Sequence, residues 1–221
     1  DKRQLTKLHE DFQQLQELTQ QLLQAQDAES TAKIALVGIE DILQYSIAGI
    51  WLVNDCNTRL EPTSMTQEAG EIISTQPVYI QEQKSLSWQA FDSQTSRRID
   101  SMDTHPDRYN AETQIKSELI VPIGKFGILN IGSTEPDAFS DEDLRRVEAW
   151  IGTVESAMDR LERITDLRER EASLQRERKR LAEFAEMISH DLQNPLNIAV
   201  GYLTRAQNIC SCEELEKLIR H

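Results

Sequence analysis

The sequence predicts an α+β protein in which a mostly antiparallel sheet is flanked by helices, with long helices at both ends of the chain. Apolar residues recur at helical spacing in the first 26 residues and again after residue 140. The stretch between them holds short β-rich segments separated by polar turns. With 221 residues, the chain is long enough for one domain with helical extensions.

Composition excludes several classes of function. The 24 Lys and Arg residues against 38 Asp and Glu give a net charge of −14, which argues against a nucleic-acid partner because phosphate binding needs a basic surface. The longest apolar run, Ile47 to Val53, is far shorter than the roughly 20 residues of a membrane span. Cys56, Cys210 and Cys212 suit free thiols in a reducing compartment better than disulfides or a zinc site. Cys56 falls in a predicted turn, and we expect it to be a buried thiol. We therefore expect a cytoplasmic location, no membrane contact and no metal site.

The first 26 residues predict a coiled-coil helix. Its apolar positions follow an alternation of three and four, which Thr19 interrupts once: Leu5, Leu8, Phe12, Leu15 and Leu22. A helix with so narrow an apolar face is marginal alone, so we expect a second copy to cover it in a parallel homodimer. Because the chain begins at Asp1 rather than Met, we also expect it to be part of a longer protein.

Residues 27–162 predict the sheet and its helices. The expected strands, in chain order, are Ile47–Val53, Arg59–Met65, Thr95–Asp103, Glu118–Ile123 and Phe126–Ser133. Ser85 is a candidate N-cap for a helix over 85–94, and residues 104–114 suggest a loop. Ser140, followed by three acidic residues, predicts the start of another helix.

From residue 141 one continuous helix is expected, with residues 163–183 forming a coiled-coil linker. A first apolar seam consists of Ile151, Val154, Met158 and Leu161. A second follows in a different register, with Ile164, Leu167, Leu174, Leu181 and Ile188. Glu171 and Arg178 fall on the second seam and weaken it. Either this weakness gives two packings of similar energy that a ligand can bias, or the segment is an imperfect spacer.

The segment over 184–206 predicts a helix with one polar and one apolar face. Stepping 100° per residue places His190 about 200° from the apolar Ile188. Asp191 can accept a proton from one ring nitrogen of His190, which leaves the other as a nucleophile. Asn194 lies one turn on, where its amide can orient a water or phosphoryl oxygen, and Pro195 should bend the helix without ending it.

The middle of the chain resembles a GAF domain, a small-molecule sensory module. The resemblance covers residues 27–162 and rests on IAGIWLV, SELIVPIGKFGILNIGS and PDAFSDEDL, in that order. It implies a ligand site between the sheet and the 85–114 region, lined by Trp51, Trp88, Phe91 and Tyr109, although these aromatics also suit an ordinary core. The ligand is left open, but no cysteine lies where covalent tetrapyrrole attachment is usual.

The segment FAEMISHDLQNPLN resembles the phosphoacceptor box of sensor histidine kinases, with Gln193 where Arg is usual. The resemblance implies that residues 184–221 begin a dimerisation and histidine-phosphotransfer domain. His190 would take the γ-phosphoryl group of ATP and pass it to an aspartate of a response-regulator receiver domain. Asp191 would serve as acid/base, and Asn194 would orient the water that dephosphorylates the regulator.

Together these features predict the sensor portion of a two-component histidine kinase. No ATP-binding motif is found, so ATP and Mg would bind a kinase catalytic domain outside this chain, which should be inactive alone and hold no cofactor. Ser211 can cap a second helix running to His221, which would form half of a four-helix bundle in the homodimer. The alternative is a ligand-binding and dimerisation scaffold in which His190 is inert.

Overall fold

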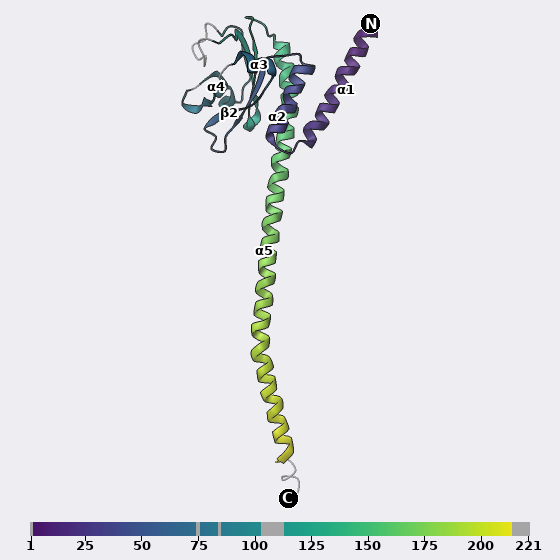
Figure 1. Ribbon diagram of the computed structural model, residues 1–221, viewed down its shortest axis with the longest axis vertical. Coiled ribbons are helices and arrows are strands. Elements are labelled where there is room, and N and C mark those ends of the chain that lie inside the picture. Colours follow the sequence, from purple (N-terminus) through teal and green to yellow (C-terminus); the bar gives the residue numbers. More distant parts are fainter. Residues whose placement is uncertain (1, 74–75, 84, 103–112, 214–221) are drawn as a thin grey trace. The chain divides into compact units, whose positions relative to one another are not determined.

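The computed structural model describes residues 2–73, 76–83, 85–102 and 113–213, and within these ranges it describes side chains from residue 12 to residue 206. The chain divides into two compact units, Asp1–Ile164 and Thr165–His221, each of which is treated by itself. The long helix α5 (Asp141–Glu213) begins in the first unit and continues through the second (Figure 1).

A six-stranded antiparallel sheet forms the centre of the first unit, with strand order β3-β2-β1-β6-β5-β4. The strands are β1 (Ala48–Val53), β2 (Arg59–Met65), β3 (Tyr79–Ile80), β4 (Arg97–Ile99), β5 (Ser117–Ile123) and β6 (Gly127–Ser133). The expected hairpins β1–β2 and β5–β6 are confirmed, whereas β4 is shorter than expected and β3 is an addition.

The remaining helices are α1 (Lys2–Gln24), α2 (Ala28–Val37), α3 (Gln67–Ile72) and α4 (Leu86–Ser93). Short helical turns occupy Gly38–Ile42, Gln81–Gln83 and Gly124–Phe126. Ser85 caps α4 as predicted, because its hydroxyl accepts a hydrogen bond from the Trp88 amide at 3.2 Å. Antiparallel strands and flanking helices make the α+β class that the sequence predicts.

The two faces of the sheet carry separate cores. Because side chains alternate along a strand, Ala48 and Ile50 of β1 face α2 and α5, whereas Trp51 faces α3 and α4. On the first face, Trp150 of α5 donates its indole hydrogen to the Ala35 carbonyl of α2 at 2.9 Å. The first turns of α5 are therefore part of the core.

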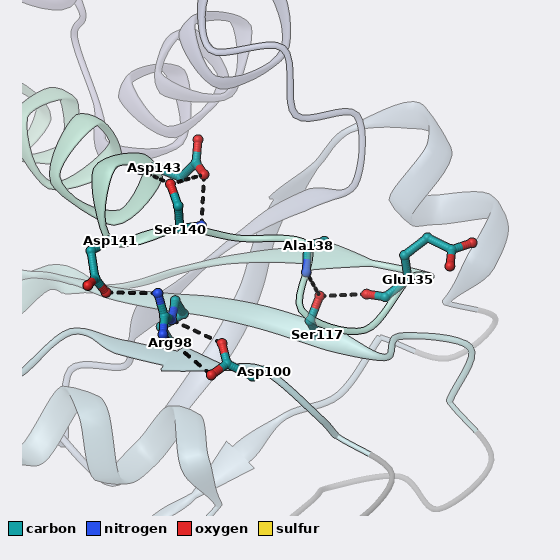
Figure 2. Close-up of polar contacts among 8 residues, drawn as sticks. All are labelled: Arg98, Asp100, Ser117, Glu135, Ala138, Ser140, Asp141 and Asp143. Atoms are coloured by element: carbon teal, nitrogen blue, oxygen red, sulfur yellow. Dashed lines mark hydrogen bonds and ion pairs between the residues drawn. The ribbon is translucent and has the colours of Figure 1, made fainter.

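The start of α5 is held by paired polar contacts (Figure 2). The Ser140 hydroxyl accepts from the Asp143 amide at 3.2 Å, and the Asp143 carboxylate accepts from the Ser140 amide at 2.8 Å. Arg98 of β4 donates to Asp141 at 2.8 Å and contacts Asp100 at 3.0 Å. These contacts confirm the predicted N-cap and tie the helix to an edge strand of the sheet.

The packing of α5 on the sheet explains why the apolar register changes near residue 161. Ile151, Val154 and Met158 of the first seam are buried against the chain's own sheet. Leu167 of the second seam is exposed and, nine residues after Met158, lies half a helical turn away from it. One face of α5 therefore closes the core of the first unit, and the seam that starts beyond it lies on the other face of the helix.

The end of α1 also packs on this core. Leu22 of the predicted seam is buried there, together with Leu18, which the seam did not include. Phe12 and Leu15 remain exposed. The apolar pattern of α1 therefore serves the chain's own domain at its C-terminal end, and only the earlier turns are left for a second copy.

Two expectations are corrected. Cys56, expected to be a buried thiol, is exposed, because the turn after β1 extends beyond the core. The helix break before Ser211 is not found, since α5 runs to Glu213 through a stretch that contains neither Gly nor Pro. The rest of the expected second helix lies outside the described residues. None of the described helices has the length and hydrophobicity that a bilayer crossing requires.

Candidate functional site

A small cavity lies against the α4 face of the sheet. Its volume is about 40 Å³, which is room for two or three waters or an equally small organic group. The described residues around it are Ile47, Ala48, Gly49, Trp51, Ala69, Ile73, Tyr79, Ile115, Glu118, Asn130 and Gly132. Most of this wall is apolar, so its few polar groups decide what the cavity can bind.

Asn130 places a buried amide in this wall. The residue is 5% exposed and sits in β6 between Gly49 of β1 and Ile120 of β5. Its Nδ2 group donates to the Tyr79 hydroxyl at 3.2 Å and to the Ser87 hydroxyl at 3.0 Å. Its Oδ1 has no hydrogen-bond partner among the described residues. An unsatisfied buried acceptor costs about 1–3 kcal/mol, which makes Oδ1 a site for an incoming donor.

Glu118 brings a carboxyl group to the same wall. It lies in β5 opposite Gly132, on the face that also carries Asn130. The side chain is partly exposed and forms no hydrogen bond or ion pair with any described residue. Loss of hydration around the carboxyl raises its pKa from 4.5 to about 7.

The floor of the cavity is fixed by Trp51. Its indole donates to the Pro77 carbonyl at 2.8 Å, and its ring meets that of Tyr79 with centroids 5.5 Å apart. The ring lies over Gly49, where a Cβ atom would come within 2.7 Å of it. A glycine at this position is therefore needed for Trp51 to occupy its place.

Of the four residues predicted to line the ligand site, one is found in the wall of this cavity. Trp51 lines the cavity, whereas Trp88 and Phe91 pack edge to face in the adjacent core at 5.5 Å between centroids and do not line it. Tyr109 lies outside the described residues. Glu118 and Asn130 were missed, although alternation along β6 already puts Asn130 on an apolar face, and a polar residue there is a signal.

A chain of contacts runs from α4 to α5 within the first unit. Gln94 is the C-cap residue of α4, and its Nε2 group donates to the Gly124 carbonyl at the β5–β6 turn, at 3.0 Å. The neighbouring Lys125 forms an ion pair with Glu162 of α5. A Cβ atom at Gly124 would come so close to the Glu155 side chain of α5 that this side chain would have to move.

The predicted phosphoacceptor segment is helical throughout, and α5 passes through Pro195 without a break, as expected. The His190 side chain is 72% exposed, and its Nδ1 lies 3.5 Å from the Asp191 carboxylate. Asn194 is also exposed. The apolar Leu192 on the other face is 58% exposed too, so exposure in this single chain does not distinguish the two faces. No cluster of three or more metal-ligating side chains occurs among the described residues.

The family follows from these features and a direct comparison. The model of the GAF domain matches residues 25–159, more than half of the chain, so the chain belongs to the GAF domain family. No curated protein matches it.

Three solved structures illustrate the fold. The GAF domain from a phosphoenolpyruvate-protein phosphotransferase of Coxiella burnetii has a TM-score of 0.57 and 15% identity, covering 71% of this chain and 96% of that one. Free methionine-R-sulfoxide reductase from Neisseria meningitidis, in complex with its substrate, has a TM-score of 0.55 and 16% identity. The match covers 68% of this chain and 89% of that one. The GAF domain of a two-component sensor histidine kinase from Bacillus halodurans has a TM-score of 0.53 and 19% identity. The match covers 64% of this chain and 99% of that one. These likenesses concern the fold alone.

Proposed function

We propose that this chain is the sensory and phosphoacceptor segment of a two-component histidine kinase. In this proposal, a small molecule in the GAF cavity controls phosphorylation of His190 and onward transfer to a response-regulator aspartate. The observation that carries it is the continuity of α5, whose first turns are buried in the sensory core and whose later turns display His190 beside Asp191. GAF domains are sensory modules, and one of the matched structures comes from a sensor histidine kinase.

The chemistry assigns a role to each side chain. With Nδ1 directed toward Asp191, the Nε2 atom of His190 is free to attack the γ-phosphorus of ATP held by a kinase catalytic domain with Mg²⁺. An N–P bond forms, the bond to the bridging oxygen breaks, ADP leaves, and the Asp191 carboxylate takes up the ring proton. The phosphoryl group then passes to the receiver aspartate, and Asn194 orients the water that later removes it.

A physical route links the cavity to α5. Asn130 contacts Ser87 of α4, and the other end of α4 contacts the β5–β6 turn through Gln94. That turn touches α5 at Glu155 and Glu162. A ligand that shifts α4 therefore has a contiguous path of contacts to α5, which is what control of a distant histidine requires.

Transfer of labelled phosphate tests the function. The chain is incubated with a histidine-kinase catalytic domain and [γ-³²P]ATP, and acid-labile label on the chain is measured. We expect labelling of the wild type, loss in His190→Gln, and full retention in the control His9→Gln. Asp191→Asn should slow the transfer at least tenfold, because the ring proton loses its acceptor.

The opposite result favours the scaffold. If the catalytic domain labels its own histidine domain but leaves this chain at background, or if His190→Gln keeps its label, His190 is not the phosphoacceptor. The GAF domain and α5 would then act in binding and dimerisation alone.

A further inference from the structure

We propose that the GAF cavity binds a small primary amine in its ammonium form, with N–H groups donated to Asn130 Oδ1 and to the Glu118 carboxylate. This inference deepens the proposed sensory role and rests on it, since it names the chemical class of the signal. It draws on the polar groups of this chain's own cavity.

The polar groups of the cavity wall favour a ligand that donates hydrogen bonds. Four of the described lining residues have polar side-chain atoms, and two of them are already engaged: Trp51 donates to a carbonyl, and the Tyr79 hydroxyl accepts from the Asn130 amide. The groups left over are Asn130 Oδ1 and the Glu118 carboxyl, and an amide oxygen and a carboxylate both accept. A ligand that satisfies both must bring at least two N–H or O–H groups.

Charge selects a cation among such donors. The Glu118 carboxyl is desolvated, and none of the described cations forms an ion pair with it, including Arg97, which lies on the same face of the neighbouring strand β4. An ammonium group supplies the missing counter-charge together with its hydrogen bonds, whereas an anion would meet a like charge. A neutral alcohol would bring only one donor.

The apolar part of the cavity wall limits the size of the ligand. Ile47, Ile73 and Ile115 surround the polar groups with apolar surface, which suits a short alkyl chain. About 40 Å³ of cavity corresponds to roughly three heavy atoms beside the wall, so ethylammonium is a suitable probe.

Titration followed by ¹H–¹⁵N NMR tests the proposal. Ethylammonium is added to the chain, and the indole resonance of Trp51, assigned with Trp51→Phe, is followed against ethanol and acetate at equal concentration and ionic strength. We expect a saturable shift with ethylammonium alone. Glu118→Gln and Asn130→Leu should each weaken binding at least tenfold, whereas Glu68→Gln, which changes an exposed side chain that does not line the cavity, should bind as the wild type does.

Several results would overturn the inference. They are a shift that does not saturate, an equal response to ethanol or acetate, unchanged binding in Glu118→Gln, or a cavity that holds only ordered water by its water–protein NOEs. Variants are compared after their circular dichroism shows the same fold. Labelling of His190 needs no amine, so its persistence in a chain that fails to bind ethylammonium would overturn the ligand class and leave the proposed function standing.

Discussion

Glu118 couples the stability of the sensory domain to pH. Its carboxyl has a pKa of about 7 in the folded chain against an ordinary value of 4.5, because burial disfavours the charged form. Between these two values the folded state holds a proton that the unfolded state has lost. The free energy of unfolding contributed by this group therefore falls as pH rises from about 4.5 to about 7, and the loss is complete above the folded pKa.

Glu118→Gln removes this pH dependence. At pH 8 the variant should be more stable than the wild type by about 2 kcal/mol, since one pKa unit is about 1.4 kcal/mol and partial exposure reduces the full effect. At pH 4 both side chains are neutral and the two proteins should agree. Urea unfolding at both pH values measures the difference. An equal gain at pH 4 and pH 8 would mean that packing, and not ionisation, accounts for it.

At the scale of elements, the turn between β5 and β6 is one of the places where the sheet contacts α5, in addition to the buried core and the Arg98–Asp141 ion pair. Gly124 has φ +46°, in the left-handed region, and a Cβ atom there would displace the Glu155 side chain of α5. Gly70, in α3, has open space around its Cβ position. The two glycines therefore form a matched pair for testing whether this contact matters.

Gly124→Ala should lower the free energy of unfolding by about 1–2 kcal/mol, from backbone strain and the displaced Glu155 side chain. Gly70→Ala should raise it by up to about 1 kcal/mol, because alanine favours a helix. Urea unfolding of both variants measures the effects. Combining Gly124→Ala with Glu155→Ala should recover the steric part of the loss. If Gly124→Ala is neutral, the turn moves freely against α5 and does not transmit a shift of α4.

Elements whose signals are local could be predicted from sequence. The start of α4 follows from Ser85, and the start of α5 follows from Ser140 with Asp143, because a cap depends on residues three positions apart. The two-residue strand β3 was missed, since only its pairing with β2 defines it. Helix α2 was missed as well, because most of its buried face consists of small residues such as Ala32 and Ala35, which give a weak periodic signal beside Leu36.

The candidate site was only partly predictable, because its residues come together through strand pairing and not through local sequence signals. Trp51 was found as a large residue in a strong strand pattern. The cavity, however, exists because β1 lies beside β6 and β5 beside β6, which brings Glu118, Asn130 and Gly49 to one wall from distant parts of the chain. Such pairing depends on the whole sheet, whereas the exposed helix around His190 depends on local periodicity alone.

At the scale of the whole molecule, the exposed seam of α5 beyond Ile164 predicts association with a second copy. Leu167, Leu174 and Leu181 repeat at seven-residue steps and are exposed in the single chain. We expect sedimentation velocity to detect a dimer, and Leu174→Glu with Leu181→Glu to convert it to a monomer. The control Arg176→Glu lies off the seam and should remain dimeric. A wild-type chain that stays monomeric at high micromolar concentration would contradict the coiled coil.

The polar residues on that seam decide between the two interpretations of its weakness. Glu171→Leu with Arg178→Leu completes the apolar repeat, so the dimer should tighten at least tenfold in sedimentation equilibrium. If the weak seam maintains two packings of similar energy, favouring one of them should also change the rate at which His190 is labelled by the added catalytic domain. A tighter dimer with an unchanged labelling rate would identify the segment as a plain spacer. The control Arg176→Leu adds the same apolar side chain off the seam and should alter neither quantity.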